Sequence, residues 1–215
     1  MGDFYTPELT RPLSIVNTDN RILAAAAKKL LEPRAAEWVS KEQKGFLPGR
    51  SMISNILEVE LAAKERVAQG KQSVIVLFDF KAAFPSVDQD FLMKVLEKAG
   101  FDAQWLTFIR KLYINNKQKI GTGGVAFTAE TGIRQGCPIS PLLFAIVADL
   151  LLRKVKAVLP EAVVQAFADD TAMVLDGLED LITVLKLFQE YATFSNLHLN
   201  LGKTVVIPLF ETCLK

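Results

Sequence analysis

The stretch Phe167-Ala168-Asp169-Asp170 places two adjacent carboxylates between two apolar runs, at 163–164 and 172–175. An apolar run, a short acidic centre and a second apolar run predict a strand, a tight turn and a strand. Neighbouring side chains of a straight strand point to opposite faces, but a turn can direct both acids toward one patch. Carboxylates held together repel unless a cation lies between them, and Mg²⁺ prefers oxygen ligands. Taken alone, the stretch fits either a solvated hairpin tip or a metal site.

The composition sets limits on the class of protein. The chain has 215 residues, half of them hydrophobic, which predicts one domain, or one domain with a lobe. The net charge of +1 is unlike that of a strongly basic nucleic-acid binder. Two cysteines give no disulfide framework, and a single histidine excludes a multi-histidine metal site. No signal-peptide pattern is present, and the most apolar stretch, 141–152, is shorter than the roughly 20 residues that span a bilayer.

A third acid, Asp79, follows the continuous apolar run 74–78, which predicts a fully buried strand. A carboxylate is costly to bury unless it is paired or bound to metal, although a structural cap is the alternative. Asp79 and Asp169 are 90 positions apart, so only the fold can bring them together. Three carboxylates on neighbouring strand ends would hold two Mg²⁺ ions about 3.5–4 Å apart. Phosphoryl transfer depends mainly on this kind of positioning and charge neutralisation.

The rest of the chain alternates helical and strand patterns. We expect Pro33 to interrupt the first helix and the Gly- and Pro-rich segment 43–50 to form a loop that ends in Arg50. Ser140 and Pro141 predict the start of a helix that is apolar nearly all round and therefore buried. The alternation from Leu197 to Leu201 predicts a strand, with Lys203 after it.

Six segments resemble, in order, the motifs of the reverse-transcriptase domain of non-LTR (LINE-type) retrotransposons. The match runs from Arg11 to Thr204, and the fourth segment is the most specific. The segments are 11–17 and 43–50 for the two finger motifs, 78–84 for palm motif A, 132–144 for motif B, 167–170 for motif C, and 197–204 for motif D.

The resemblance implies a set of catalytic and metal-binding roles. Asp79, Asp169 and Asp170 would bind two Mg²⁺ ions, with Mn²⁺ as an alternative ion. The backbone carbonyl of Phe80 would complete one metal shell, and Lys203 would approach the triphosphate and protonate the pyrophosphate leaving group. A solvated lysine at position 203 is the alternative.

The resemblance also implies nucleotide-binding roles. Phe84 would lie under the incoming sugar and exclude a 2′-hydroxyl, although an ordinary core phenylalanine is the alternative. Gln135 would touch the nucleotide or template, and Gly136 would let the backbone approach the nascent pair closely. Arg11 and Arg50 would contact triphosphate or template phosphate through bidentate hydrogen bonds, where the alternative is a solvated surface charge.

The fold implied is α+β: a right-hand polymerase palm, built as an antiparallel sheet with packed helices, together with fingers. We expect fingers at 1–70 and a palm at 71–215, with a hairpin at 118–134 on the boundary, in one reverse-transcriptase domain. The partners would be an RNA template, a DNA primer and dNTPs, with no membrane, and the location would be intracellular, in nucleus or cytoplasm. We expect thumb and endonuclease regions to be missing from this chain and to belong to a longer parent protein.

Two alternatives stay open. A truncated, inactive relic or an RNA- or protein-binding module would suit the missing thumb and the near-neutral charge, because phosphate contacts supply most nucleic-acid affinity. Clustered carboxylates favour the RNA-directed DNA polymerase, since a non-catalytic module gains nothing from them. A group II intron or retron enzyme would share the palm, but the segment 134–138 fits the LINE type better.

Overall fold

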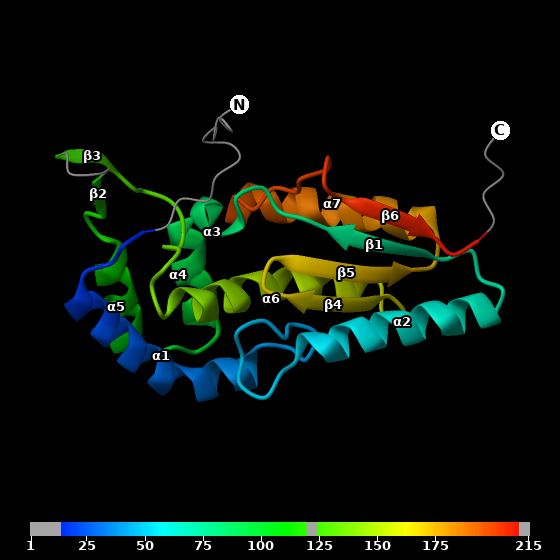
Figure 1. Cartoon of the computed structure of the whole chain (residues 1–215), viewed down its shortest axis with the longest axis horizontal. Helices are drawn as coiled ribbons and strands as arrows, with labels where there is room; N and C mark the ends of the chain where they lie inside the picture. The colour runs from blue at the N-terminus through cyan, green and yellow to red at the C-terminus, as the bar shows by residue number, and fades with distance from the viewer. Residues whose placement is uncertain (1–13, 120–123, 211–215) are drawn as a thin grey trace, which may run out of the picture.

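The computed structural model describes residues 14–119 and 124–210. Its main sheet is antiparallel and has the strand order β4-β5-β1-β6. Its strands are β1 (Val74–Phe78), β4 (Val163–Phe167), β5 (Asp170–Leu175) and β6 (Val205–Pro208). A separate hairpin of β2 (Lys117–Lys119) and β3 (Val125–Thr128) lies at the far end of the molecule (Figure 1).

Two helices cover one face of this sheet, and a third packs against β4 and β5 on the other face. Figure 1 shows α6 and α7 behind the strands and α2 running along the β4 side. The helices are α1 (Thr18–Trp38), α2 (Met52–Ala68), α3 (Ala83–Ser86), α4 (Gln89–Lys98), α5 (Ala103–Tyr113), α6 (Ser140–Val158) and α7 (Leu178–Ser195). The expectation of an α+β fold with an antiparallel sheet and packed helices is confirmed. None of the helices in the described ranges is both long and apolar enough to cross a membrane.

Strand β1 is buried on one face, where the sequence predicts burial on both. Val74, Val76 and Phe78 are buried, and the Phe78 ring stacks on Phe188 of α7 with centroids 4.7 Å apart. Leu77 points to the other face and is 41% exposed. A run of five apolar residues does not reveal whether a second layer covers the sheet, because periodicity is absent in either case.

The helix α6 confirms the predicted buried helix. Twelve of its residues are buried, among them Phe144 and Leu151 in the core. It also buries one charged residue, Asp149, which has no exposed surface. Buried charges need partners, and those of Asp149 come from Ser40 in the loop after α1 and from Arg153 on α6 itself.

Two local expectations are wrong. The first helix does not break at Pro33 but continues to Trp38. The buried side chains of Leu31 and Ala35 hold the helix against the core on both sides of the proline. The stretch 197–201 makes only one isolated bridge, from Leu199 to Phe80, and the strand at this edge of the sheet is β6. All four residues of β6 are exposed, so its burial pattern carries no alternation.

Candidate active site

The register of the central strands brings the predicted acids to one end of the sheet. Phe78 at the end of β1 pairs with Thr171 of β5, so the next positions along the two strands are Asp79 and Asp170. Asp170 begins β5 and pairs with Phe167 at the end of β4, which leaves Ala168 and Asp169 as the turn. The three carboxylates therefore come from adjacent strand ends, as the sequence predicts.

The turn itself has a strained backbone. Ala168 has φ of +59°, in the left-handed region that a residue with a side chain rarely adopts. The cost of that conformation is about 1–2 kcal/mol for a non-glycine residue. Ala168 is also buried, so the residue next to the acids is held by its surroundings.

Asp79 is held by a segment more than a hundred residues later in the chain. The side-chain amide of Asn200 donates to Oδ2 of Asp79 over 3.1 Å, and the backbone N–H of Asn200 donates to the Asp79 carbonyl over 2.7 Å. The N–H of Lys203 donates to the Asn200 carbonyl over 3.0 Å. Lys203 is therefore one turn after Asn200, the residue that contacts Asp79, and its side chain is exposed. Phe80 is buried and stacks on Phe188.

The donor set suits a hard divalent cation, because carboxylate oxygens are the ligands that Mg²⁺ prefers. Among the residues the structure describes, no three His, Cys, Asp or Glu side chains gather closely enough to form a metal centre. The Asp79 carboxylate is instead turned to Asn200. Placement on adjacent strand ends therefore fits a shared metal site, and rotation of side chains would be needed to complete it.

Phe84 lies in an aromatic group beside the turn. Its ring stacks on Phe144 of α6, with centroids 4.4 Å apart, and meets the edge of Phe46 at 6.4 Å. Phe46 in turn lies 6.0 Å from Phe167, the last residue before the turn. Phe84 is half-buried, so part of its side chain packs in the core and part is exposed.

Gln135 and Gly136 lie on a loop against the start of the described chain. The N–H of Ser14 donates to the Gln135 carbonyl over 3.0 Å. Gly136 has φ of +98°, and a Cβ added there would lie 2.6 Å from the Ser14 carbonyl oxygen. In this structure the close approach that requires glycine is thus to Ser14. Arg11, the other predicted phosphate ligand, lies outside the described residues.

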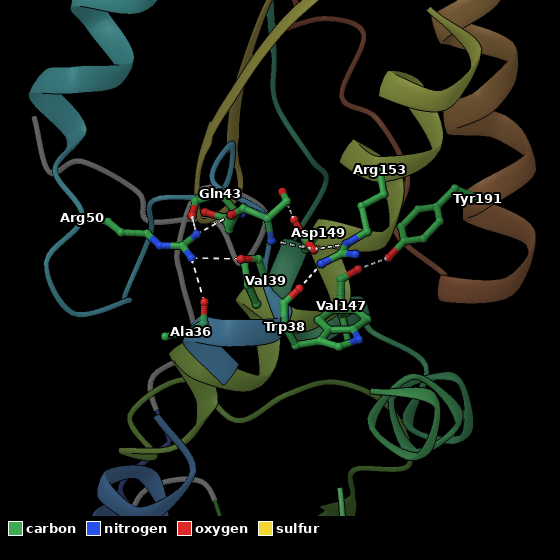
Figure 2. Close-up of polar contacts among 10 residues, drawn as sticks. Ala36, Trp38, Val39, Gln43, Arg50, Val147, Asp149, Arg153 and Tyr191 are labelled. Carbon is green, nitrogen blue, oxygen red and sulfur yellow. Dashed lines mark hydrogen bonds and ion pairs between the residues drawn. The ribbon is translucent and has the colours of Figure 1, made fainter. Parts of the chain in front are cut away.

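Arg50 donates its hydrogen bonds to the protein backbone, where the sequence predicts contact with phosphate. Its two terminal nitrogens donate to the backbone carbonyls of Ala36, Val39, Ser40 and Gln43, as Figure 2 shows. Burial lowers the pKa of Arg50, and the carboxylates of Asp149 and Glu42 oppose that shift. These contacts use the guanidinium to hold the protein backbone, and they favour a structural role for Arg50 over phosphate binding.

Asp149 holds the same loop from the side of α6. It accepts hydrogen bonds from the backbone N–H of Ser40 over 3.1 Å, from the Ser40 hydroxyl, and from Nε of Arg153 over 2.6 Å (Figure 2). Arg153 also donates to the Trp38 carbonyl and lies over the Trp38 ring. The end of α1 and the loop after it are therefore held by Asp149 and Arg153 of α6 and by Arg50 from another part of the chain.

Sequence reasoning gave no role to Gln43, although it lies in a predicted motif. Its side chain is fully buried and bonds to Ala168, 125 residues away. Asn200, which holds Asp79, was likewise only part of a motif. No local pattern marks either residue, because a polar residue in a loop reveals neither its partner nor its burial.

An antiparallel sheet backed by helices, with acids at the ends of neighbouring strands, defines the palm of a template-directed polymerase. The sequence profile of the family described as reverse transcriptase (RNA-dependent DNA polymerase) matches residues 6–209. The chain therefore belongs to the reverse transcriptase family, whose members use divalent metal ions. The predicted resemblance is thereby confirmed.

The relatives point to non-LTR elements. The chain is 29% identical to the transposon TX1 uncharacterized 149 kDa protein of Xenopus laevis, over 94% of this chain and 16% of that protein. It is 28% identical to the Pol polyprotein from a type-1 retrotransposable element R2 of Popillia japonica, over 97% of this chain and 31% of that protein. The chain thus spans less than a third of the length of these curated relatives.

A solved structure shares the fold. Telomerase from Candida tropicalis, in complex with a fragment of telomeric RNA, superimposes with a TM-score of 0.67 at 14% identity, over 88% of this chain and 34% of that one. At this identity the likeness concerns the fold alone, and it agrees with the palm architecture.

Proposed function

We propose that this chain is the RNA-directed DNA polymerase domain of a non-LTR retrotransposon and that it joins dNTPs to the 3′-hydroxyl of a primer. The observation that carries the proposal is the placement of Asp79, Asp169 and Asp170 at the same end of adjacent antiparallel strands. Asp79, Asp169 and Asp170 would hold two Mg²⁺ ions, with the backbone carbonyl of Phe80 as a further ligand. Bound there, the ions would lower the pKa of the attacking hydroxyl and neutralise the leaving pyrophosphate.

The remaining roles follow from position. Phe84 would lie under the sugar, where a large flat ring leaves no volume for a 2′-hydroxyl. Lys203, on the turn that follows Asn200, would donate a proton to the pyrophosphate. Gln135 and Gly136 would border the nascent base pair, and Arg11 would bind phosphate. The boundary between fingers at 1–70 and palm at 71–215 belongs to the same proposal.

A cationic cavity supports an RNA template as partner. It has a volume of about 860 Å³ and lies between the start of α1, the end of α5 and β2. Lys111, Lys117, Lys119 and Arg134 are among its lining residues. Basic side chains bind phosphate backbones independently of sequence, which suits a template strand.

Primer extension tests the proposal. Purified protein receives a DNA primer annealed to an RNA template, with dNTPs and Mg²⁺. We expect Asp169→Asn/Asp170→Asn to reduce extension to background, because amides replace the two carboxylates that would bind metal. A matched control is Asp19→Asn/Asp90→Asn, which removes the same charge from exposed first turns of α1 and α4.

The control should extend primers as the wild type does. Extension by Asp169→Asn/Asp170→Asn at the wild-type rate would contradict the proposal. If neither the wild type nor Asp169→Asn/Asp170→Asn extends primers, although both unfold cooperatively, an inactive reverse-transcriptase domain becomes the better explanation.

A further inference from the structure

The segment 42–45 closes the outer edge of the catalytic hairpin. The N–H of Ala166 in β4 donates to the Glu42 carbonyl over 2.9 Å, and the N–H of Lys44 donates to the Ala166 carbonyl over 2.8 Å. These two bonds form a parallel bridge between Gln43 and Ala166. The bridge lies two residues before Ala168, so the segment reaches the strained turn directly.

The side chain of Gln43 encloses the backbone of that turn. Its Oε1 accepts from the N–H of Ala168 over 2.8 Å and from the N–H of Gly45 over 2.9 Å, and its Nε2 donates to the Ala168 carbonyl over 3.1 Å. Gln43 is fully buried. A side-chain amide supplies both an acceptor and a donor, so it can satisfy both backbone groups of one residue. Both peptide groups that flank Ala168 are thereby fixed, including the one that leads into Asp169.

Two further contacts hold Gln43 in place. The guanidinium of Arg50 donates to the Gln43 carbonyl over 2.6 Å (Figure 2). On the other side, Gly45 lies so close to the turn that a Cβ added there would be 2.2 Å from the Ala168 nitrogen. Arg50 therefore anchors the backbone of Gln43, and the side chain of Gln43 anchors the turn.

We propose that Gln43 is a positioning residue, which holds Ala168 in its left-handed conformation and so sets the directions of the Asp169 and Asp170 carboxylates. The inference rests on the proposed polymerase function, because it concerns the metal ligands of that site. Groups that orient metal ligands from outside affect metal affinity even though they do not touch the ion. A strained turn relaxes when the contacts that impose its conformation are removed.

The test uses Gln43→Met, which keeps the length of the side chain and removes its hydrogen bonds. The matched control is Asn55→Leu. Asn55 is also buried and donates over 2.9 Å to Ala166 on the same strand, but not to the turn. Both variants lose a buried amide, so both should melt below the wild type.

Two measurements on the full chain separate the variants. In Gln43→Met, the Ala168 amide should lose its protection against hydrogen exchange, and the Kd for Mn²⁺ should rise about tenfold or more, as for other residues that orient metal ligands. Asn55→Leu should change neither quantity. Adding Ala168→Gly to Gln43→Met should restore much of the Mn²⁺ affinity, because glycine adopts a positive φ without strain.

The possible failures are distinguishable. Unchanged exchange at Ala168, or Mn²⁺ affinity equal to that of Asn55→Leu, would overturn the positioning role and leave the polymerase proposal intact. A wild-type protein that binds no Mn²⁺ would overturn the metal site, and with it both proposals.

Discussion

At the scale of single residues, Phe84 has two uses that the sequence presents as alternatives. Its stacking on Phe144 belongs to the core, whereas its contact with Phe46 leads toward the turn that carries the acids. Being half-buried, it can pack against α6 and still present a ring edge to a ligand. The two roles should separate in experiment, because packing affects stability and the exposed part affects the choice of sugar.

We therefore expect Phe84→Ala to raise the ratio of rNTP to dNTP incorporation roughly tenfold, since truncation opens volume for one more hydroxyl. Steady-state incorporation of single nucleotides measures the ratio. The control is Phe91→Ala, which removes another half-buried ring, packed on Tyr191 at 5.6 Å. A ratio that stays at the wild-type value in Phe84→Ala, or moves equally in Phe91→Ala, would leave Phe84 as a core residue only.

At the scale of elements, Arg50 joins the end of α1 to the loop that precedes α2. The last carbonyls of a helix have no partner within the helix, and a cation there also interacts favourably with the helix dipole. Arg50 donates to the carbonyls of Ala36 and Val39 at this end and to Ser40 and Gln43 just beyond it. Its planar fork reaches several oxygens at once, which a lysine ammonium cannot do.

Arg50→Lys should accordingly lower the free energy of unfolding by about 2–4 kcal/mol, since a lysine ammonium cannot reach all four of these partly buried carbonyls. Urea denaturation measures the change. Arg110→Lys, at an exposed position on α5, serves as the control and should unfold like the wild type. If Arg50→Lys keeps wild-type stability but raises the KM for dNTPs, the phosphate-binding role suggested by the sequence is the correct one.

At the scale of the whole molecule, two tyrosines are buried in the core. Burial raises the pKa of Tyr113 and of Tyr191 above the range of an exposed phenol. Tyr191 of α7 donates to the Val147 carbonyl of α6 over 2.7 Å. Both phenols stay protonated in the folded protein at a pH where the unfolded chain loses those protons.

The folded-state pKa lies above the unfolded value, so this stabilisation is fully present below about pH 10 and is lost as the pH rises toward the folded pKa. Above pH 10 we expect the free energy of unfolding to fall by about 1.4 kcal/mol per pH unit for each tyrosine. Urea denaturation between pH 9 and 11 measures the slope. Tyr113→Phe/Tyr191→Phe should flatten it, and an equally steep slope in that variant would refute the explanation.

What could be predicted from the sequence was whatever has a local pattern. The acids, the strands that carry them and the buried helix α6 each follow from short-range periodicity or from an unusual charge, and the family motifs supplied their order. Gln43 and Asn200 could not be assigned roles, because their partners lie more than a hundred residues away. Pro33 misled because packing on both sides of a proline can outweigh its local preference, and β6 was missed because none of its residues is buried.

The catalytic end is assembled from four distant parts of the chain: the loop with Gln43, the end of β1 with Asp79, the β4–β5 turn with Asp169, and the turn with Asn200. Contacts between segments so far apart in sequence close large loops and form slowly during folding. During synthesis, a ribosome must release residues beyond Asn200 before Asp79 can acquire its partner. Interrupted translation would therefore yield chains with an incomplete catalytic centre, and the catalytic centre would form only late in synthesis of the chain.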